Sequence, residues 1–122
     1  MITFETIEKI SLKQNGAIKE YKPTWDSTLF RIGENGKMFI LVMHGKTPMM
    51  NFKNDPFINL HLRENYPDIT AAYHMNKKHW NTLYYKHTTI SKEFLEQLIQ
   101  ESYEIVFDSL TKKQKMALGE FN

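Results

Sequence analysis

The sequence predicts an α+β fold, in which an antiparallel β-meander is covered on one face by helices. Two turn segments that combine Gly with Asn or Pro, 33–36 and 45–48, separate short apolar segments in the pattern of successive hairpins. A long segment with helical spacing of its apolar residues follows at 91–110, and no Gly-rich turn joins a strand to a helix. Strands that are grouped before the long helix favour a segregated α+β fold over alternating β-α-β units.

The size and composition of the chain indicate a single domain, which we expect to span residues 1–122. The chain is 41% hydrophobic and 13% aromatic, which is enough to build a core. Its longest apolar run, Met38 to Met43, is too short to cross a bilayer, and the N-terminus lacks the pattern of a signal peptide. We therefore expect a cytoplasmic protein that does not bind membranes, with a monomer as the default state.

The first half of the chain predicts one helix and then four strands. Thr3 can cap the helix, and the Asn-Gly pair at 15–16 can end it. The segment 37–44 is nearly all apolar, so we expect a central strand that is covered on both faces. The four expected strands are 17–21, 28–32, 37–44 and 49–53.

The second half predicts three helices and one further strand. Asp55 and Pro56 favour a helix start, because Asp caps well and Pro suits the first turn. A strand is expected at 81–85 after a polar crossover, Ser91 caps the longest helix, and Thr111 begins a short last helix. The expected apolar side of the helix at Asp55 consists of Phe57, Ile58, Leu60 and Leu62.

The residues with the most distinctive chemistry are His-Met-Asn-Lys-Lys-His-Trp at 74–80. The surrounding segment, from Ile69 to Lys92, contains four lysines and no Asp or Glu, although the net charge of the whole chain is only +2. The positive character is therefore local, and two adjacent lysines in a turn can neutralise phosphate groups. The long helix has a Glu-rich side that would repel phosphates, so a nucleic acid is expected on the sheet-and-turn side.

The 74–80 segment and the strand after it resemble the conserved block H-hydrophobic-N-K-x-H-W of the MmcQ/YjbR family. One departure is Asn-Gly at 15–16, where many members of the family have Pro-Gly. The resemblance implies a frataxin-like (CyaY-like) double-wing fold and the function of a DNA-binding protein. Three more segments resemble the family: Gly-Lys-Met-Phe at 36–39, Lys-Asn-Asp-Pro at 53–56 and Ser-Tyr at 102–103.

Several residues of this segment have two interpretations each. Trp80 can stack on a base, but its position in a strand beside Leu83 favours a core anchor. Asn76 can read an adenine edge, but closing the turn with its own side chain is better supported. Tyr84 and Tyr85 point to opposite faces of the strand, so one is expected to be buried and the other available.

The sequence contains no arrangement that predicts catalysis or a metal. Cysteine is absent, which excludes disulfides and thiolate chemistry. His74 and His79 are five residues apart, and a metal site that joins them to His61 or His87 is the less favoured alternative. The hydroxyl groups of the Ser-Tyr pair at 102–103 are expected to bond to nearby carbonyl groups.

We therefore predict a non-enzymatic protein, without cofactor or metal, that binds DNA weakly and largely without sequence preference. The alternative is a protein–protein interaction module that uses the same basic and aromatic surface. The turn lysines Lys37 and Lys46 can assist the contact. The residues expected to contact DNA are His74, Asn76, Lys77, Lys78, His79, Trp80, Tyr84, Lys86 and Lys92.

Overall fold

The computed structural model describes residues 1–119 of the chain. In chain order the helices are α1 (Phe4–Leu12), the short 3₁₀ helix η1 (Pro23–Trp25), α2 (Pro56–Asn65), α3 (Lys92–Asp108) and α4 (Lys112–Ala117). The strands are β1 (Ala17–Lys22), β2 (Ser27–Ile32), β3 (Met38–Met43), β4 (Met49–Lys53), β5 (Ile69–Ala71) and β6 (Trp80–Tyr84).

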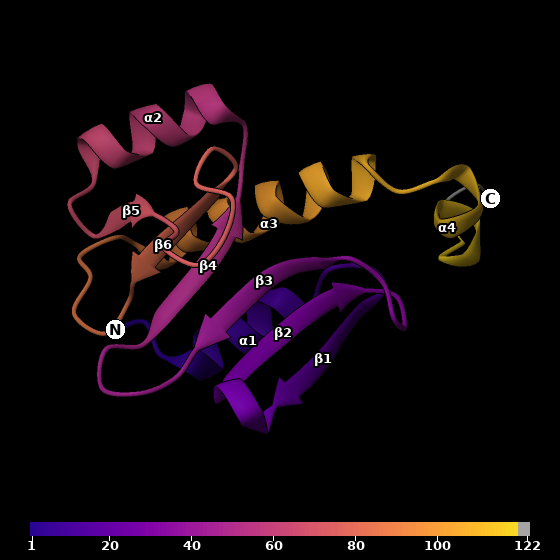
Figure 1. Cartoon of the computed structure of the whole chain (residues 1–122), viewed down its shortest axis with the longest axis horizontal. Helices are drawn as coiled ribbons and strands as arrows, with labels where there is room; N and C mark the ends of the chain where they lie inside the picture. Colours follow the sequence, from indigo (N-terminus) through magenta and orange to yellow (C-terminus); the bar gives the residue numbers. More distant parts are fainter. Residues whose placement is uncertain (120–122) are drawn as a thin grey trace.

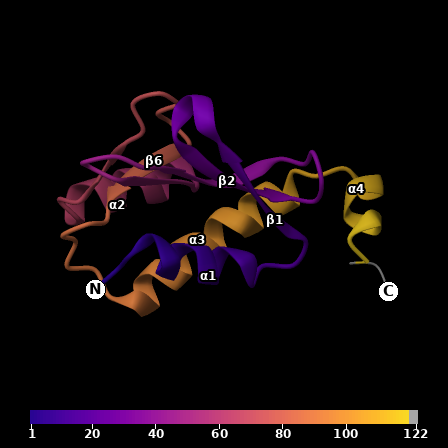
Figure 2. The ribbon, with the colours of Figure 1, turned by 90° about the horizontal axis from the view of Figure 1, so that it is seen from below.

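The strands form one antiparallel sheet in the order β1-β2-β3-β4-β6-β5. The first four strands follow one another as a meander, and β6 joins β4 after the chain has passed through α2 and β5. Figure 1 shows α1 and α3 behind the sheet, and Figure 2, which views the sheet from its edge, places both helices on the same side. The predicted α+β meander with helices on one face is confirmed.

Alternation along the central strands sends one set of apolar side chains toward α1 and α3. In β3, β4 and β6 these fully buried residues are Ile40, Val42, Met50, Phe52 and Leu83. Burying each such side chain contributes roughly 1.5–3 kcal/mol to stability. The facing residues of α3 are Leu95, Leu98, Ile99 and Val106.

The four α-helices begin where the sequence predicts, because each start depends on a capping side chain. Thr3, Asp55, Ser91 and Thr111 each accept a hydrogen bond from a backbone N–H in the first turn of their helix. None of the helices in the described part of the chain is both long enough and apolar enough to span a membrane.

The second face of the sheet is not covered by a helix among the described residues. Leu41 and Met43 of β3 point to this face and are only half-buried, so the expectation of a strand covered on both faces is wrong. Alternation points every second residue of β3 to this face. An apolar sequence does not show whether a layer of helices covers that face, which is why the expectation failed. We call this surface the open face; its central residues are Leu41, Met43, Met49, Asn51, Thr82 and Tyr84.

The side of α2 that faces the protein agrees with the expected one only at Leu62. Phe57 is 82% exposed and Leu60 is 61% exposed, whereas Asn59 is fully buried and Leu62 nearly so. The helix lies beside β5 at the edge of the sheet (Figure 1). On its inner side Leu62 joins the core, as expected, whereas Asn59 bonds to the loop before β6. The 3₁₀ helix η1 is not among the elements that the sequence predicts, and β5 lies in the segment that is expected to be a polar crossover.

Gly36 closes the turn between β2 and β3, and we expect Gly36→Ala to destabilise the protein. A Cβ atom at this position would lie 1.8 Å from the carbonyl oxygen of Ile32. Because that atom belongs to the backbone, the turn itself must move, at a cost of about 1–3 kcal/mol or more in the free energy of unfolding. Urea denaturation measures this loss.

The exposed neighbour Glu34 provides the control for this prediction. Glu34→Ala changes a solvent-exposed side chain in the same turn and is expected to shift the free energy of unfolding by no more than about 0.5 kcal/mol. Equal denaturation midpoints for the two variants would show that the turn relaxes around the added methyl group.

Candidate functional site

The loop 72–79, which links β5 to β6, contains a tight turn that Asn76 closes. The Asn76 side-chain oxygen accepts a hydrogen bond from the backbone N–H of Lys78 at 2.9 Å. The Asn76 carbonyl accepts from the N–H groups of His79 at 3.2 Å and Trp80 at 2.9 Å. The predicted role of Asn76 as the closing residue of the turn is confirmed.

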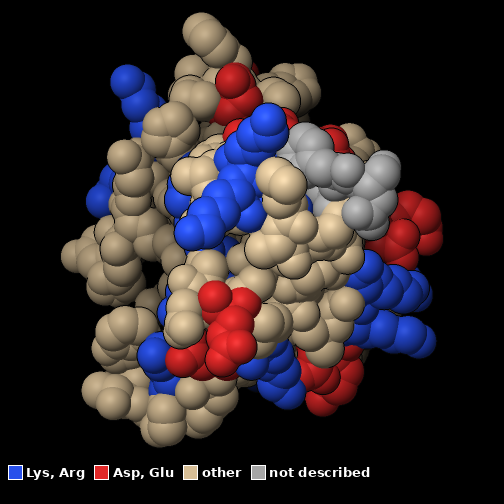
Figure 3. Space-filling model, turned by 90° about the vertical axis from the view of Figure 1, so that its right-hand side faces the viewer, with Lys and Arg blue, Asp and Glu red and all other residues tan. Residues whose placement is uncertain are grey.

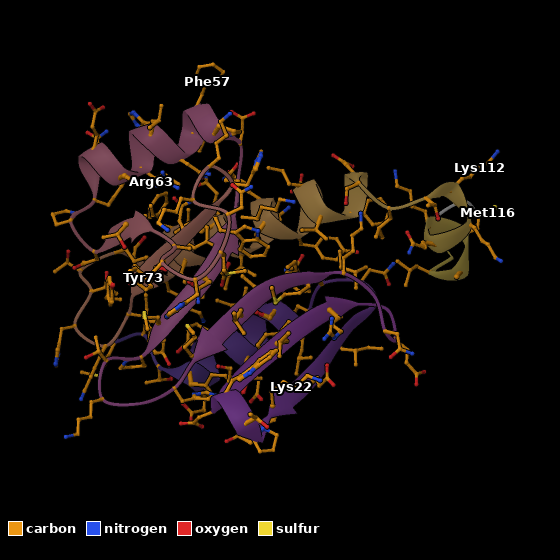
Figure 4. All side chains as sticks on the ribbon, viewed as in Figure 1. Lys22, Phe57, Arg63, Tyr73, Lys112 and Met116 are labelled. Carbon is orange, nitrogen blue, oxygen red and sulfur yellow. The ribbon has the colours of Figure 1, made fainter. Side chains whose placement is uncertain are left out.

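Arg63 of α2 supports this loop from behind. Its guanidinium donates hydrogen bonds to the carbonyl groups of Lys77 and Trp80 and, at 2.8 Å, to the side-chain oxygen of Asn81. Figure 4 shows Arg63 on the side of α2 that faces the loop and β6. Because the planar guanidinium bonds to three oxygens, it fixes the turn and the start of β6 relative to α2.

Asn59 supports the same loop one helical turn earlier. Its side-chain nitrogen donates to the carbonyl groups of Asn54 and Lys78, each at 3.0 Å, and its side-chain oxygen accepts from Asn81. Sequence reasoning missed both Asn59 and Arg63. The available signal was two polar residues at i, i+4 spacing, which places them on the same side of the helix.

Within the described residues 1–119, no carboxylate forms an ion pair with Arg63. The ion pairs among residues 1–119 join Glu8 to Lys19 and Glu20 to Lys22 and Arg31. Burial lowers the pKa of the Arg63 guanidinium, but arginine remains a cation at neutral pH. Its positive charge therefore adds to that of the loop lysines in front of it.

The lysines of the loop are exposed to solvent. Lys77 donates through Nζ to the carbonyl of Tyr73 at 3.2 Å, and the same Nζ lies 5.5 Å from the centre of the Tyr73 ring. Lys78 is exposed beside it. Lys53 of β4, which is paired with Trp80 in the sheet, places its Nζ 6.0 Å from the centre of the Trp80 ring. The basic groups thus lie next to aromatic rings.

Trp80 does not anchor the core, so this expectation is wrong. It is half-buried and lies outside the core cluster, on the open face of β6. The reason is alternation, since Trp80 and Leu83 are three residues apart and must point to opposite faces. The prediction for the two tyrosines is confirmed, because Tyr85 is 5% exposed and Tyr84 is 38% exposed.

The structure brings some of the other expected contact residues to this surface and separates others. Lys86 and Lys46 line one hollow together with Asp68 and with Tyr84 of the open face. Lys92 starts α3 in the helical layer and lines a different hollow with α1, so it does not join the loop. Lys37 donates to Ser109 beyond the end of α3 and is engaged there instead.

His74 and His79 remain separate contributors to this surface. The His74 ring packs edge-on against Tyr73 with centroids 4.7 Å apart, and His79 is half-buried beside Trp80. Within the described residues 1–119, no three His, Asp or Glu side chains are grouped so that they could hold a metal ion.

The charges elsewhere on the molecule are mixed or paired. Figure 3 shows acidic and basic side chains interspersed over the end that carries α4. At the β1–β2 end of the open face, Arg31 and Lys22 both bond to Glu20, and the Arg31 bond holds the pKa of that carboxyl below its usual value. The loop 72–79 differs because its cations have no such acidic partner among residues 1–119.

The hydroxyl groups of Ser102 and Tyr103 are used for structure. Ser102 donates to the carbonyl of Phe39 at 2.6 Å and accepts from the N–H of Lys53 at 2.8 Å. Tyr103 donates to the carbonyl of Asn15 at 2.6 Å. The prediction that these hydroxyls bond to nearby carbonyls is confirmed, although the carbonyls belong to other elements and not to α3.

The chain is similar to other proteins in sequence and in structure. The YjbR family model matches residues 12–105. Protein YbdF of Escherichia coli O157:H7 is 38% identical over 96 residues, which cover 78% of this chain and 75% of YbdF. The crystal structure of Deinococcus radiodurans protein DR2400, with family domain DUF419, has a TM-score of 0.87 at 26% identity and covers 98% of this chain and 89% of that one. A Pseudomonas syringae protein has a TM-score of 0.72 at 24% identity, covering 87% of this chain and 99% of that one, which shows the fold alone.

Proposed function

This chain belongs to the YjbR family, and we propose that its loop 72–79 binds the phosphate backbone of DNA, weakly and largely without regard to base sequence. The sequence resemblance at 74–80 lies inside the matched region. The proposed role is binding and not catalysis.

The observation that carries the proposal is a cationic turn that is fixed from behind. Lys77 and Lys78 are exposed, while their carbonyl groups accept hydrogen bonds from Arg63 and Asn59. A fixed backbone reduces the conformational entropy that is lost when the ammonium groups meet phosphates. Arg63 adds a third positive charge at the same place.

The distribution of acids supports contact on the loop side and not on the helical side. The outer side of α3 carries several acids, whereas 69–92 contains none. A phosphate backbone would be repelled by the first surface and attracted to the second. The acidic residues of α3 are Glu93, Glu96, Glu101, Glu104 and Asp108.

The proposal predicts that binding to a duplex weakens steeply with salt. If four to six cations contact phosphates, the slope of log K against log salt is about −4 to −5. The double variant Lys77→Ala/Lys78→Ala removes two contacts and is expected to reduce the magnitude of this slope by about 2. Fluorescence anisotropy of a labelled duplex of about 20 base pairs measures both, since that length covers the whole domain.

A second pair of adjacent lysines provides a matched control. Lys112 and Lys113 are exposed on α4, at the opposite end of the molecule from the loop (Figure 4). Lys112→Ala/Lys113→Ala removes the same charge and should leave the slope within experimental error of the wild type. Absence of binding at low salt, a flat salt dependence or an equal loss in the control would overturn the proposal.

A further inference from the structure

A pocket of about 270 Å³ lies on the open face, beneath the beginning of the loop 72–79. Its floor is built from neighbouring strands, in which Met43, Met49 and Tyr84 occupy matching positions across β3, β4 and β6. Tyr73 from the loop forms part of the wall, with His74 and Met75 beside it. The pocket therefore combines an apolar floor with a wall that belongs to the cationic loop.

A second row of residues makes the floor partly polar. Asn51 and Thr82 line the pocket next to Leu41, and the Thr82 hydroxyl donates to the Asn51 side-chain oxygen at 2.6 Å. The Asn51 nitrogen donates to the Leu41 carbonyl at 3.1 Å. These bonds hold an amide and a hydroxyl in place beneath the pocket, where the polar edge of a ligand could meet them.

Two tyrosines of the pocket are available for stacking. Tyr73 is 78% exposed and Tyr84 is 38% exposed, and both line the pocket. Figure 4 shows Tyr73 in front of the sheet, on the side away from α3. Exposed aromatic rings beside cationic groups are the combination that binds single-stranded nucleic acid, because bases stack on the rings while phosphates meet the cations.

Basic groups lie at two sides of this pocket. Lys77 contacts Tyr73 at the loop, and the hollow of Lys46 and Lys86 adjoins the pocket through their common residue Tyr84. One acid, Asp68, also lines this hollow, where its carboxylate accepts a hydrogen bond from Thr88, so the lysines exceed the acids there by one charge. The volume is slightly below the roughly 300–1,000 Å³ of pockets for drug-sized ligands, so it has room for one ring system and not for a base pair.

We propose that the pocket takes one base of single-stranded DNA, stacked on Tyr73, while the adjoining phosphates contact Lys77 and Lys78 on one side and Lys46 and Lys86 on the other. This inference rests on the proposed function and specifies the form of DNA that is bound. A paired base inside a duplex is already stacked and cannot enter, so single strands bind more tightly than duplexes of the same length.

The test compares a labelled strand of thymidines with a duplex of equal length, using Tyr73→Ala. Losing one stacked base is expected to weaken binding of the single strand by about 5- to 150-fold. Binding of the duplex and the salt slope of both ligands should remain unchanged, because the lysines are retained. Tyr73→Phe keeps the ring and should bind the single strand like the wild type.

Two controls separate stacking from other effects of the substitution. Phe57→Ala removes an aromatic ring that is 82% exposed on α2 and points away from the loop (Figure 4), and it should leave binding unchanged. A strand in which the bases are replaced by abasic sites keeps its phosphates, and wild type and Tyr73→Ala should bind it equally.

The outcomes distinguish this inference from the proposed function. If Tyr73→Ala binds the single strand as the wild type does, while Lys77→Ala/Lys78→Ala loses binding, then stacking is overturned and backbone binding stands. Stronger binding of the duplex than of the single strand would also overturn the inference. If neither ligand binds at low salt, both proposals fail together.

Discussion

Replacing Asn59 with alanine is expected to lower the free energy of unfolding by about 2–4 kcal/mol and to loosen the loop 72–79. Asn59 is fully buried, and its side chain bonds to Asn54, Lys78 and Asn81. Alanine has no amide group, so Asn54, Lys78 and Asn81 each lose their bond to this side chain. Each buried polar group that loses its partner costs about 1–3 kcal/mol. The total is expected to stay at about 2–4 kcal/mol, because water can replace the lost bond at the carbonyl of the exposed Lys78.

The consequence for the loop can be measured separately from the loss of stability. Asn59 and Arg63 together fix the backbone of Lys77 and Lys78, so the variant should open the turn more often than the whole protein unfolds. Trypsin cleaves after lysine, and brief digestion under native conditions should cut the variant after Lys77 and Lys78 faster than the wild type. Mass spectrometry of the fragments identifies the sites.

Asn65 provides the matched control on the same helix. It is exposed at the end of α2 and bonds to the carbonyl of His61, so Asn65→Ala is expected to change stability by no more than about 0.5 kcal/mol. If Asn59→Ala behaves like Asn65→Ala in both stability and digestion, the buried amide does not hold the loop, and Arg63 alone must do so.

The parts of the fold that depend on neighbouring residues could be predicted from the sequence. Thr3 and Thr111 cap helices through bonds to residues three positions later, so the pattern is complete within a few residues. The strand at 49–53 and the turn at 33–36 were also found, because hairpin signals are local. The family resemblance at 74–80 allowed the overall fold to be predicted in addition to these local elements.

The parts that depend on distant residues could not be read in the same way. The apolar residues Phe57 and Leu60 suggested a buried helix face, but α2 lies at the sheet edge, where its inner side consists of the core residue Leu62 and a polar network around Asn59. Tyr73 was missed as a pocket residue, because the loop must first fold over the open face before the ring meets β3 and β4. The position of Trp80 could have been predicted from the sequence, because alternation along the strand places it on the opposite face from the buried Leu83.

The other large expected effect concerns Ser102, which joins α3 to the sheet. Ile40 and Phe52 form the last cross-strand pair of β3 and β4 at this end. Beyond that pair, the carbonyl of Phe39 and the N–H of Lys53 bond to the Ser102 hydroxyl and not to each other. One hydroxyl therefore satisfies a donor and an acceptor at the point where the two strands separate.

Ser102→Ala is expected to lower the free energy of unfolding by about 2–4 kcal/mol, because two backbone groups lose their buried partner. The Ser102 side chain is fully buried, so water cannot replace it without opening the contact between α3 and the sheet. Urea denaturation measures the loss of stability. Hydrogen exchange at the Lys53 amide should become faster in the variant relative to that at Phe52, which keeps its place in the strand ladder.

Ser109→Ala is the control for a general effect of replacing a serine at or near α3. It is exposed just after the helix, where its hydroxyl donates to the carbonyl of Val106, and Ser109→Ala is expected to cost no more than about 0.5 kcal/mol. Equal stability of the two variants would mean that Phe39 and Lys53 find each other once the hydroxyl is gone. In that case the packing of α3 separates β3 from β4, and the Ser102 hydroxyl bonds to the two strands without being needed to keep them apart.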